Sequence, residues 1–560
     1  MKRIIYLLLT VITVNIYGQS EPVFVERVYM QTDKQLYLAG EIVYMKVLTV
    51  SYDKKPLSFS KIAYVELVNE SISLVQIKIE LSNGVGEGWM ELPLNLPTAH
   101  YRLIAYTRFM RNENESVFFE KNIGIINTFL PNQISRNKSE ETPMQTLDYT
   151  YDPTCAVQTD KTVYSIREKG NLKLDGLPND VHTLSVSIAG KSDVAIDDTN
   201  EIWQWEKQTT TVSKTFSGNY IPEYEGHIIT GKIVPAQSST NTVDEILTPL
   251  LSFPGDKLYL FEGQRDESNN VFFYASNTAG VKEMATSALN HTDNIFRIDL
   301  QSPFIEQHAS KKLPALRVDS SHFNNLLDRK VALQALYSFT KDTLLQNRTG
   351  DNRFNLKPTN TYLLDEFTRF IVMNELMVEF IFDLRFRKNV RQKWELYLSK
   401  KTGLTDIFWV RPLVVLDGIP IMEHSIIYNY DPLLVERVNI YAGEYAYGGM
   451  KYDGIAEFLT YKRNYPSLTI DQSIQIVNYA GAQAPRRFII PDYSIEKNRI
   501  SRLPDYRHTL LWEPMTPTNA QSSIEIPFYT SDFTGEFLVT VEGLTEEGKI
   551  IYASKSFEVR

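Results

Sequence analysis

A six-residue pattern near the start of the chain occurs a second time with the same internal spacing. The two sets are Gln31, Thr32, Asp33, Lys34, Tyr37 and Glu41, and Gln158, Thr159, Asp160, Lys161, Tyr164 and Glu168. All six matches share one offset, 158 − 31 = 127 residues, which is about the length of one small domain. The repeat therefore indicates that the chain was built by copying a module.

Both copies have the sequence pattern of β-strands. After the first motif, residues 42–50 and 63–68 are rich in branched and aromatic side chains and lack a helical period. After the second motif, residues 172–174 and 184–188 alternate apolar and polar side chains, as half-buried strands do. We therefore expect each copy to form a β-sandwich.

The segment from Tyr29 to Glu41 resembles the opening strand and turn of a macroglobulin-type β-sandwich, the building block of alpha-2-macroglobulin and complement proteins. The residues that carry the resemblance are Thr32, Asp33, Lys34, Tyr37, Gly40 and Glu41. Short polar side chains at such a position commonly shape a turn before a strand, so a structural role is favoured over contact with a ligand. Neither Asp33 nor Asp160 is assigned to a site.

The second copy lacks the closing half that the first copy has. In the first copy, Glu91-Leu92-Pro93 precedes a long alternating strand at 100–106. The same arrangement reappears only near the C-terminus, where Glu525-Ile526-Pro527 precedes the strand at 535–543. We hypothesise that the second sandwich is discontinuous, with residues 150–222 completed by residues 505–560.

Length and composition limit the classes of protein that this chain can be. Its 560 residues are enough for about three to five domains. A net charge of −10 argues against a nucleic-acid partner, which requires a dense basic face. The 32 tyrosines and 28 phenylalanines favour folded, mainly β modules.

The first residues have the pattern of a secretory signal peptide, which we place at residues 1–18. Lys2 and Arg3 precede the apolar stretch 4–16, and Gly18 offers a small residue at the cleavage point. The stretch is shorter than the roughly 20 residues that span a bilayer, and no other segment is apolar enough, so no transmembrane segment is expected. We expect an exported protein of the periplasm or associated with the outer membrane.

The chain has one cysteine, Cys155, which excludes an internal disulfide and an N-terminal lipoprotein anchor. Thioester-containing macroglobulins carry a cysteine followed closely by Glu-Gln, whereas Cys155 is followed by Ala156, Val157 and Gln158. The resemblance therefore does not extend to thioester chemistry. A buried thiol is the favoured interpretation.

No motif for catalysis, metal binding or cofactor binding is present. The chain has no HExxH, GxSxG, paired CxxC or glycine-rich phosphate loop, and its eight histidines are far apart in sequence. We therefore expect no enzyme activity, and we assign no catalytic, cofactor-binding or metal-binding residue.

Strand patterns continue between residues 226 and 320. Residues 227–234 alternate well, and further strand-like segments lie at 257–261, 271–274 and 295–300. The region is similar to the carboxypeptidase-regulatory-like domains of Gram-negative envelope proteins, although residues 237–240 replace the usual small-residue turn. A third β-sandwich is expected here.

Helical spacing of apolar side chains is found only between about residues 323 and 401, where two or three helices are expected. One apolar face consists of Leu326, Leu327, Val331, Leu333, Leu336 and Tyr337, and the other of Phe367, Phe370, Ile371, Met373, Leu376, Met377 and Phe380. A basic cluster follows, formed by Arg385, Arg387, Lys388, Arg391 and Lys393. We interpret it as a solvated face after a helix, with contact to anionic headgroups as a minor alternative.

The next fifty residues resemble the plug domain of TonB-dependent outer-membrane receptors. The matching pieces are residues 412–421, Asp431-Pro432, 435–440, 447–449 and 454–456. The pattern predicts a turn at Asp417-Gly418, a short helix or turn opened by Asp431-Pro432, and an inward-packed Val435. A receptor would need a barrel of about 22 strands after its plug, and only about 100 residues remain. The resemblance therefore implies a plug fold used as a scaffold.

Together these patterns predict a mainly β protein of several β-sandwiches with a small α+β plug-like domain. We place the macroglobulin-like sandwich at 22–128, the carboxypeptidase-regulatory-like sandwich at 226–320, the helical segment and plug-like domain at 321–465, and a β-rich C-terminal region at 466–560.

The whole arrangement, including the tail strand Phe528-Tyr529-Thr530-Ser531-Asp532, is similar to a group of exported Gram-negative envelope proteins. It implies a non-enzymatic binding or scaffolding protein that docks with an outer-membrane transporter or secretion partner through the plug-like module. The alternatives are a macroglobulin-type protease-binding protein without a thioester and a surface adhesin. Partner, ligand and oligomeric state stay open.

Overall fold

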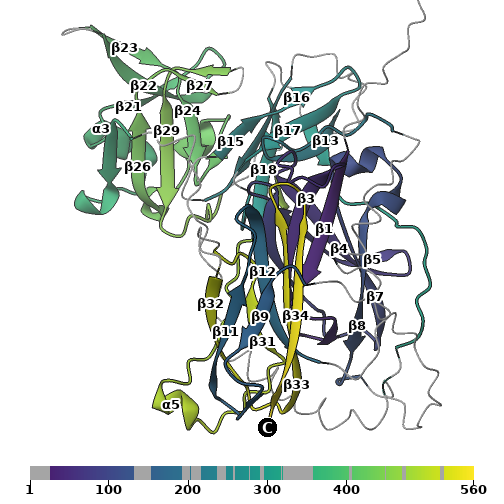
Figure 1. The fold of residues 1–560 in the computed structure, drawn as a ribbon. Helices are drawn as coiled ribbons and strands as arrows, with labels where there is room; N and C mark the ends of the chain where they lie inside the picture. The colour runs from purple at the N-terminus through teal and green to yellow at the C-terminus, as the bar shows by residue number, and fades with distance from the viewer. Residues whose placement is uncertain are drawn as a thin grey trace, which may run out of the picture.

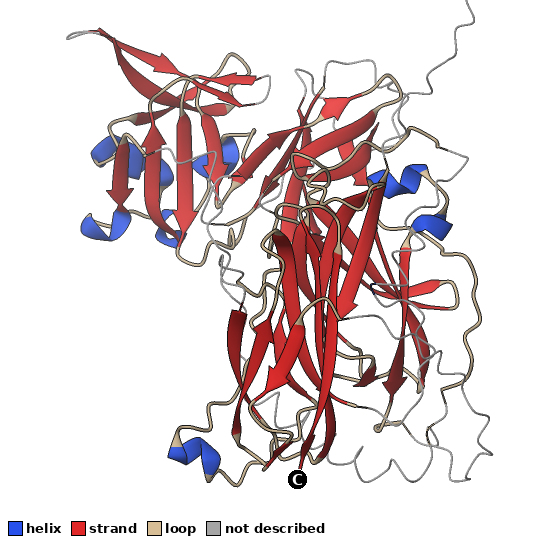
Figure 2. Cartoon of the chain, in the orientation of Figure 1, coloured by secondary structure: helices blue, strands red, loops and turns tan. Residues whose placement is uncertain are grey.

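The protein is described from a computed structural model. The described residues are 25–130, 153–191, 202, 216–235, 247–255, 259–276, 278–289, 296–316, 318, 357–402, 406–447, 450–468, 474–517 and 523–560. The expected signal peptide and the apolar face at 326–337 lie outside these residues. The described chain is mainly β, as predicted from sequence (Figure 2).

The first sandwich consists of two sheets, built from residues 26–126, whose strands pair mostly in the antiparallel direction. One sheet has the order β1-β3-β6 and the other β2-β8-β7-β4-β5. Their bounds are β1 (Glu26–Thr32), β2 (Leu36–Leu38), β3 (Ile42–Ser51), β4 (Ile62–Asn69), β5 (Ile72–Glu80), β6 (Val85–Glu91), β7 (Ala99–Thr107) and β8 (Phe119–Ile126). Fully buried Tyr37, Tyr64 and Tyr101 contribute to its core, because aromatic side chains bury a large apolar area each.

The second sandwich combines strands from both ends of the described chain. One sheet has the order β10-β34-β33-β12-β31 and the other β32-β11-β9. Their bounds are β9 (Ala156–Thr159), β10 (Val163–Tyr164), β11 (Lys169–Asp175), β12 (Val181–Gly190), β31 (Thr509–Glu513), β32 (Ser523–Tyr529), β33 (Gly535–Thr545) and β34 (Ile550–Val559). The strands that the sequence hypothesis assigned to one discontinuous sandwich therefore pair with one another.

The register of these pairs shows how closely the two ends are joined. Val186 of β12 is opposite Val541 of β33, and Leu172 of β11 is opposite Ile526 of β32. Figure 1 shows the yellow C-terminal strands alongside blue β12. The second copy of the repeated module thus gains its closing strands from a segment more than three hundred residues later in the chain.

The third sandwich lies between these two halves in sequence. Its sheets have the orders β16-β17-β13-β19 and β15-β14-β18-β30. Their bounds are β13 (His227–Pro235), β14 (Thr248–Phe253), β15 (Tyr259–Glu262), β16 (Gln264–Arg265), β17 (Asn270–Ala275), β18 (Glu283–Leu289), β19 (Phe296–Leu300) and β30 (Ile474–Asn478). Strand β30 follows the plug-like region in sequence, so the plug-like region is an insertion into the third sandwich.

The segment 301–316, which we expected to end the third sandwich, contains no strand and lies along the first sandwich instead. The His308 amide donates to the Ser71 carbonyl at 3.1 Å, and an Arg102 guanidinium nitrogen donates to the Ala309 carbonyl at 2.9 Å. Leu316 packs on the small apolar cluster that includes Leu36. The segment therefore ties the third sandwich to the first.

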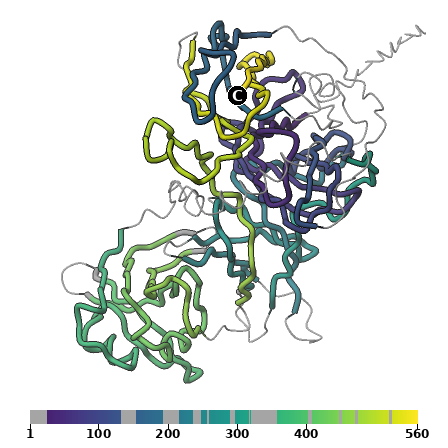
Figure 3. The backbone as a smooth tube through the Cα atoms, turned by 90° about the horizontal axis from the view of Figure 1, so that it is seen from below, coloured from purple at the N-terminus to yellow at the C-terminus, as the bar shows by residue number. Residues whose placement is uncertain are grey.

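The plug-like region has a main sheet of order β20-β26-β29-β24-β25, a three-stranded sheet β21-β22-β23 and the hairpin β27-β28. The strand bounds are β20 (Asn360–Leu363), β21 (Leu384–Lys388), β22 (Trp394–Thr402), β23 (Asp406–Val410), β24 (Leu413–Leu416), β25 (Ile419–Pro420), β26 (Val435–Tyr441), β27 (Tyr445–Tyr447), β28 (Met450–Tyr452) and β29 (Ile455–Thr460). Two short helices, α3 (Met373–Glu379) and α4 (Ser425–Tyr428), pack on these sheets. In Figure 3 this green region lies at the opposite end from the yellow C-terminal strands.

The helical prediction for residues 323–401 was wrong in its last part. Residues 384–388 and 394–402 are strands, and the basic cluster lies on and between them rather than after a helix. The reason is a period of two: Leu384 and Phe386 are buried while Arg385 and Arg387 are exposed. The expected helix around Phe367–Phe380 is present only as the short helix α3.

Candidate functional site

In the first copy, the repeated residues form one hydrogen-bonded turn, as expected from their types. The Tyr37 hydroxyl donates to Asp33 Oδ1 at 2.8 Å, and the same oxygen accepts from the Tyr44 amide at 3.1 Å. Lys34 Nζ lies 2.9 Å from Glu41 Oε2. These contacts fix the path of the chain from β1 through β2 to β3.

The second copy repeats these contacts nearly one for one. The Tyr164 hydroxyl donates to Asp160 Oδ1 at 2.6 Å, and that oxygen accepts from the Asn171 amide at 2.7 Å. Lys161 pairs with Glu168. The conserved geometry explains the sequence repeat by the needs of a turn, without a ligand.

The two copies differ in their surroundings. Asp33 lies in the contact between the first and second sandwiches, where the Thr509 hydroxyl donates to its Oδ2 at 2.6 Å and the Ser187 hydroxyl donates to its carbonyl at 2.6 Å. Burial raises the pKa of Asp33 above its ordinary value. Burial also acts on Asp160, but hydrogen bonds from Asn171 and Tyr164 hold its pKa below the ordinary value.

One position of the turn changes between the copies in a way that points to a specific contact. The offset of 127 places Arg167 where the first copy has Gly40. Both residues have a left-handed backbone, with φ of 53° at Arg167 and 89° at Gly40. Glycine adopts this region freely, whereas for another residue it costs about 1–2 kcal/mol. The interactions of the Arg167 side chain account for the strained residue.

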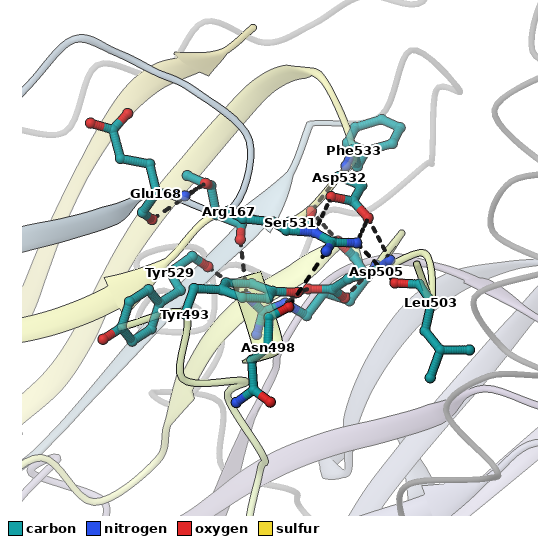
Figure 4. A network of polar contacts seen from close by, with 12 residues as sticks. Arg167, Glu168, Tyr493, Asn498, Leu503, Asp505, Tyr529, Ser531, Asp532 and Phe533 are labelled. Carbon is teal, nitrogen blue, oxygen red and sulfur yellow. Dashed lines mark hydrogen bonds and ion pairs between the residues drawn. The ribbon is translucent and has the colours of Figure 1, made fainter. Parts of the chain in front are cut away.

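Arg167 holds a long connecting loop against the second sandwich (Figure 4). Its Nε and Nη2 atoms each lie 2.6 Å from a carboxylate oxygen of Asp532. Its guanidinium also donates to the carbonyls of Arg499 at 3.0 Å, Ser501 at 2.6 Å and Leu503 at 2.8 Å. These carbonyls belong to the last residue of α5 (Glu496–Arg499) and the turn after it. The expected tail strand at 528–532 ends at Tyr529, and Asp532 lies in the loop beyond it, where its carboxylate orients the Arg167 guanidinium.

The loop around α5 is anchored at further points. The Tyr493 hydroxyl donates to Asp505 Oδ2 at 2.7 Å, and the Asp505 amide donates to Asp532 Oδ2 at 2.8 Å. An Arg507 guanidinium nitrogen donates to the Tyr529 carbonyl at 2.6 Å. Because these contacts surround Arg167, the loop and the sandwich form one polar network. This network was not predicted from the sequence, although the presence of Arg167 where the first copy has Gly40 is a signal for it.

A second polar cluster lies at the junction of the first and third sandwiches and is fully enclosed. The Tyr64 hydroxyl lies 2.9 and 3.0 Å from the two carboxylate oxygens of Glu223. His227 Nδ1 is hydrogen-bonded to the Tyr479 hydroxyl. Lys78 Nζ lies 4.2 Å from the centre of the Tyr479 ring. Burial raises the pKa of Glu223 to about 7 and lowers the pKa of Lys78 to about 7. All five side chains are buried, so the cluster joins domains and does not offer an open site. Its members come from four separate segments, which no local pattern reveals.

The turn expected in the plug-like region is present. Asp417 and Gly418 have φ of 46° and 83° and connect β24 to β25. The buried Asp417 carboxylate accepts from the Thr460 amide at 2.7 Å and the Tyr465 amide at 2.7 Å, which joins the turn to the end of β29. The Asp431 side chain accepts from the Leu433 amide at the start of the short 3-10 helix η5 (Pro432–Leu434), as predicted.

The plug-like region is fixed to the third sandwich by apolar and polar contacts. Leu250 and Leu260 of the third sandwich pack with Leu413, Val415 and Ile455 of the plug-like sheet. A backbone hydrogen bond of 2.8 Å joins the Gly255 amide to the Asp417 carbonyl. The contact holds one side of the plug-like region in place and leaves its far side outward (Figure 1).

The far side of the plug-like region exposes large apolar side chains. Helix α3 buries Met373, Leu376 and Met377. Val378 of the same helix is exposed, and the neighbouring residues Ile371 and Phe382 are 77% and 72% exposed. We call Ile371, Val378 and Phe382 the α3 patch. Exposed apolar side chains of this size gathered around one short element are typical of interaction surfaces.

The single cysteine of the chain lies in the core of the second sandwich. Cys155 is buried, and burial raises the pKa of its thiol to about 11, which disfavours the reactive thiolate. No group of three metal-ligating side chains converges among the described residues. Within the same residues, no helix combines the length and the apolar character needed to cross a membrane.

Comparisons with known proteins give distant structural likenesses only. No protein-family model matches the chain, and no curated protein sequence matches it. A mutant of Salmonella alpha-2-macroglobulin is similar at 11% identity and a TM-score of 0.24, over 95% of this chain and 39% of that one. Escherichia coli alpha-2-macroglobulin activated by porcine elastase is similar at 8% identity and a TM-score of 0.24, over 96% of this chain and 44% of that one.

The Escherichia coli adhesin FdeC is similar at 9% identity and a TM-score of 0.15, over 53% of this chain and 66% of that one. The chain thus spans about two fifths of the length of the macroglobulins it matches. TM-scores this low do not establish a shared fold along the whole chain, so the mainly β architecture rests on the strand pairings described above.

Proposed function

We propose that this chain is a non-enzymatic binding or scaffolding protein of the bacterial cell envelope, and that its plug-like region docks with an outer-membrane protein. The observation that carries the proposal is the α3 patch, which presents Ile371, Val378 and Phe382 on the far side of the inserted region. A partner that covers these side chains would gain their apolar burial, at about 25 cal/mol per Å².

The way in which the plug-like region is attached supports the same role. It is held to the third sandwich by the cluster around Leu413 and by the hydrogen bond between Gly255 and Asp417. A surface that is already fixed in orientation loses less freedom when it binds, which favours affinity. The sandwiches then act as a support that presents the plug-like region to its partner.

Site-specific photo-crosslinking in cells tests the proposal. A photoreactive amino acid would replace Val378 in one variant and Ile371 in a second, with exposed Ile72 of the first sandwich as the matched control position. We expect one discrete outer-membrane protein to be captured from both patch positions and not from Ile72. Equal capture from all three positions, or none from the patch, would refute docking through this region.

Two other functions follow from the sequence resemblance and have separate tests. A macroglobulin-type protease-binding protein would be cut at a discrete site by broad-specificity proteases and would then change shape, which limited proteolysis and small-angle scattering detect. A surface adhesin would be removed by protease shaving of intact cells. No contact in the described residues favours either function over docking.

A further inference from the structure

The three-stranded sheet β21-β22-β23 has one face that carries basic and aromatic side chains together. Arg385 of β21 is opposite Tyr397 of β22, and Trp409 of β23 is opposite the next residue of β22 on that face, Ser399. Arg387 is two residues after Arg385 and therefore shares its face. We call Arg385, Arg387, Tyr397 and Trp409 the Arg-Trp face.

The opposite face of the same sheet is part of the apolar core. Leu384, Phe386, Leu396 and Leu398 are buried and pack in the cluster that contains α3. This burial fixes the sheet, so the Arg-Trp face must point outward. The basic residues are therefore held in position rather than spread along a flexible segment.

The two arginines lie over the same aromatic ring. The guanidinium carbon of Arg385 is 5.1 Å from the centre of the Trp409 ring, and that of Arg387 is 5.3 Å from it and 5.9 Å from the centre of the Tyr397 ring. Arginines that stack on rings keep the N–H groups at their edges available for phosphate oxygens. Two like charges beside one ring also repel each other, and an external anion would relieve that repulsion.

The face contains little negative charge to balance them. Within these three strands it carries one carboxylate, Glu395, which accepts hydrogen bonds from the Tyr397 hydroxyl at 2.9 Å and the Asn389 amide group at 3.1 Å. Among the described residues, no carboxylate lies within ion-pair distance of Arg385 or Arg387. Glu395 is opposite Arg387 in the strand register, so the four residues of the Arg-Trp face and Glu395 together carry two positive charges and one negative charge, in a chain whose net charge is −10.

Apolar side chains are exposed at both ends of the same sheet, since Val390 lies beside the Lys388–Trp394 pair and Ile407 lies opposite Lys401. Val390, in the turn between β21 and β22, is 99% exposed, and Ile407, on the same face of β23 as Trp409, is 59% exposed. Surfaces that contact the headgroup layer of a bilayer commonly combine arginine and tryptophan with exposed aliphatic side chains.

We infer that the Arg-Trp face binds the surface of an anionic lipid bilayer, with its arginines on lipid phosphates and Val390 and Ile407 at the headgroup boundary. A bilayer is favoured over an acidic protein because the outward face combines arginines and aromatic rings with exposed aliphatic side chains at its two ends, and a membrane surface can receive all three kinds of group when the sheet lies face-on. The inference goes beyond the proposed function, since it concerns lipid and holds whether or not the α3 patch binds a protein.

The test is co-sedimentation of the purified chain with vesicles of phosphatidylcholine, with and without phosphatidylglycerol, at low and high salt. We expect binding only to the anionic vesicles and weaker binding at high salt. The double variant Arg385→Gln, Arg387→Gln should bind about 25-fold more weakly, at about fivefold for each charge. The matched control removes two exposed basic residues elsewhere, through Lys497→Gln and Arg499→Gln on α5, and should change binding less than about twofold.

A third variant guards against an effect on folding. The Val390 side chain is almost fully exposed, so Val390→Asp removes no packing contact and should leave the unfolding midpoint unchanged. The same variant should still weaken vesicle binding. Absence of binding to anionic vesicles by the unmodified chain would overturn the inference. Equal loss in the double variant and in the α5 control would also overturn it, because binding would then follow net charge and not this face.

Discussion

Replacing Arg167 by glycine tests whether this arginine is what holds the α5 loop. The substitution gives the second copy the residue that the first copy has, so it relieves the left-handed strain of about 1–2 kcal/mol. It also removes the paired hydrogen bonds to Asp532, which together are worth about 2–3 kcal/mol, and three bonds to loop carbonyls at about 0.5–1 kcal/mol each. We expect a net loss of about 3 kcal/mol for the closed loop, or about 150-fold in its opening equilibrium.

Hydrogen exchange measured by mass spectrometry reports this opening directly. Peptides from residues 489–508 should exchange about 150-fold faster in Arg167→Gly, while peptides from β33 and β34 should change little. Arg167→Ala should open the loop further than Arg167→Gly, because alanine keeps the strain that glycine relieves.

A double-mutant cycle separates the ion pair from the other contacts. Asp532→Asn should cost about 2 kcal/mol alone and much less when Arg167 is already glycine, so the two changes should be non-additive by about 1 kcal/mol or more. The control is Lys161→Gln in the same turn, which breaks an exposed ion pair and should leave loop exchange unchanged. Unchanged exchange at 489–508 in Arg167→Gly, or equally faster exchange across the whole sandwich, would show that the reasoning is wrong.

Three further predictions follow from buried or strained positions. Because burial raises the pKa of Glu223 to about 7, the stability that this site contributes is complete below pH 4.5 and is lost as the pH rises through 7; melting temperatures should fall over this range, and Glu223→Gln should flatten the fall. Cys155 should stay unlabelled by maleimide at pH 8 in the folded chain and react at once in urea, whereas rapid labelling of the folded chain would contradict its burial. Gly418→Ala should cost more than the roughly 1 kcal/mol of its positive φ, because the added Cβ would lie 2.8 Å from the Phe253 carbonyl oxygen; Gly176→Ala, with φ of 75° and no atom within 4 Å, is the control in chemical denaturation.

Sequence reasoning succeeded where the signal is local. The turn at Asp33 and its copy at Asp160 use short polar side chains next to alternating strands, and both features can be recognised within about ten residues. The Asp417-Gly418 turn and the Asp431 cap are of the same kind. The pairing of β12 with β33 was also foreseen, because the missing closing half of the second copy had a visible counterpart at the C-terminus.

Features that depend on distant pairing could not be predicted. Strand β30 has five residues and no distinctive alternation, yet it completes the third sandwich by pairing with β18, nearly two hundred residues earlier. The cluster of Glu223, Tyr64, Lys78 and Tyr479 is likewise assembled from segments that are far apart in sequence. The error at residues 384–402 has a different cause: the apolar spacing of the preceding helix was extended into residues whose period is two.

The insertion of one domain within another sets an order on how this chain can complete its fold. In sequence, the plug-like region is inserted into the third sandwich, and the third sandwich is inserted into the second. Each outer domain therefore lacks a strand until the domain inserted into it has been synthesised. During synthesis from the N-terminus, β12 stays without its neighbour β33 until more than three hundred further residues have emerged. An open strand edge of this kind is prone to aggregation, so a chaperone that shields β11 and β12 would be needed most in the interval before β32 and β33 have been made.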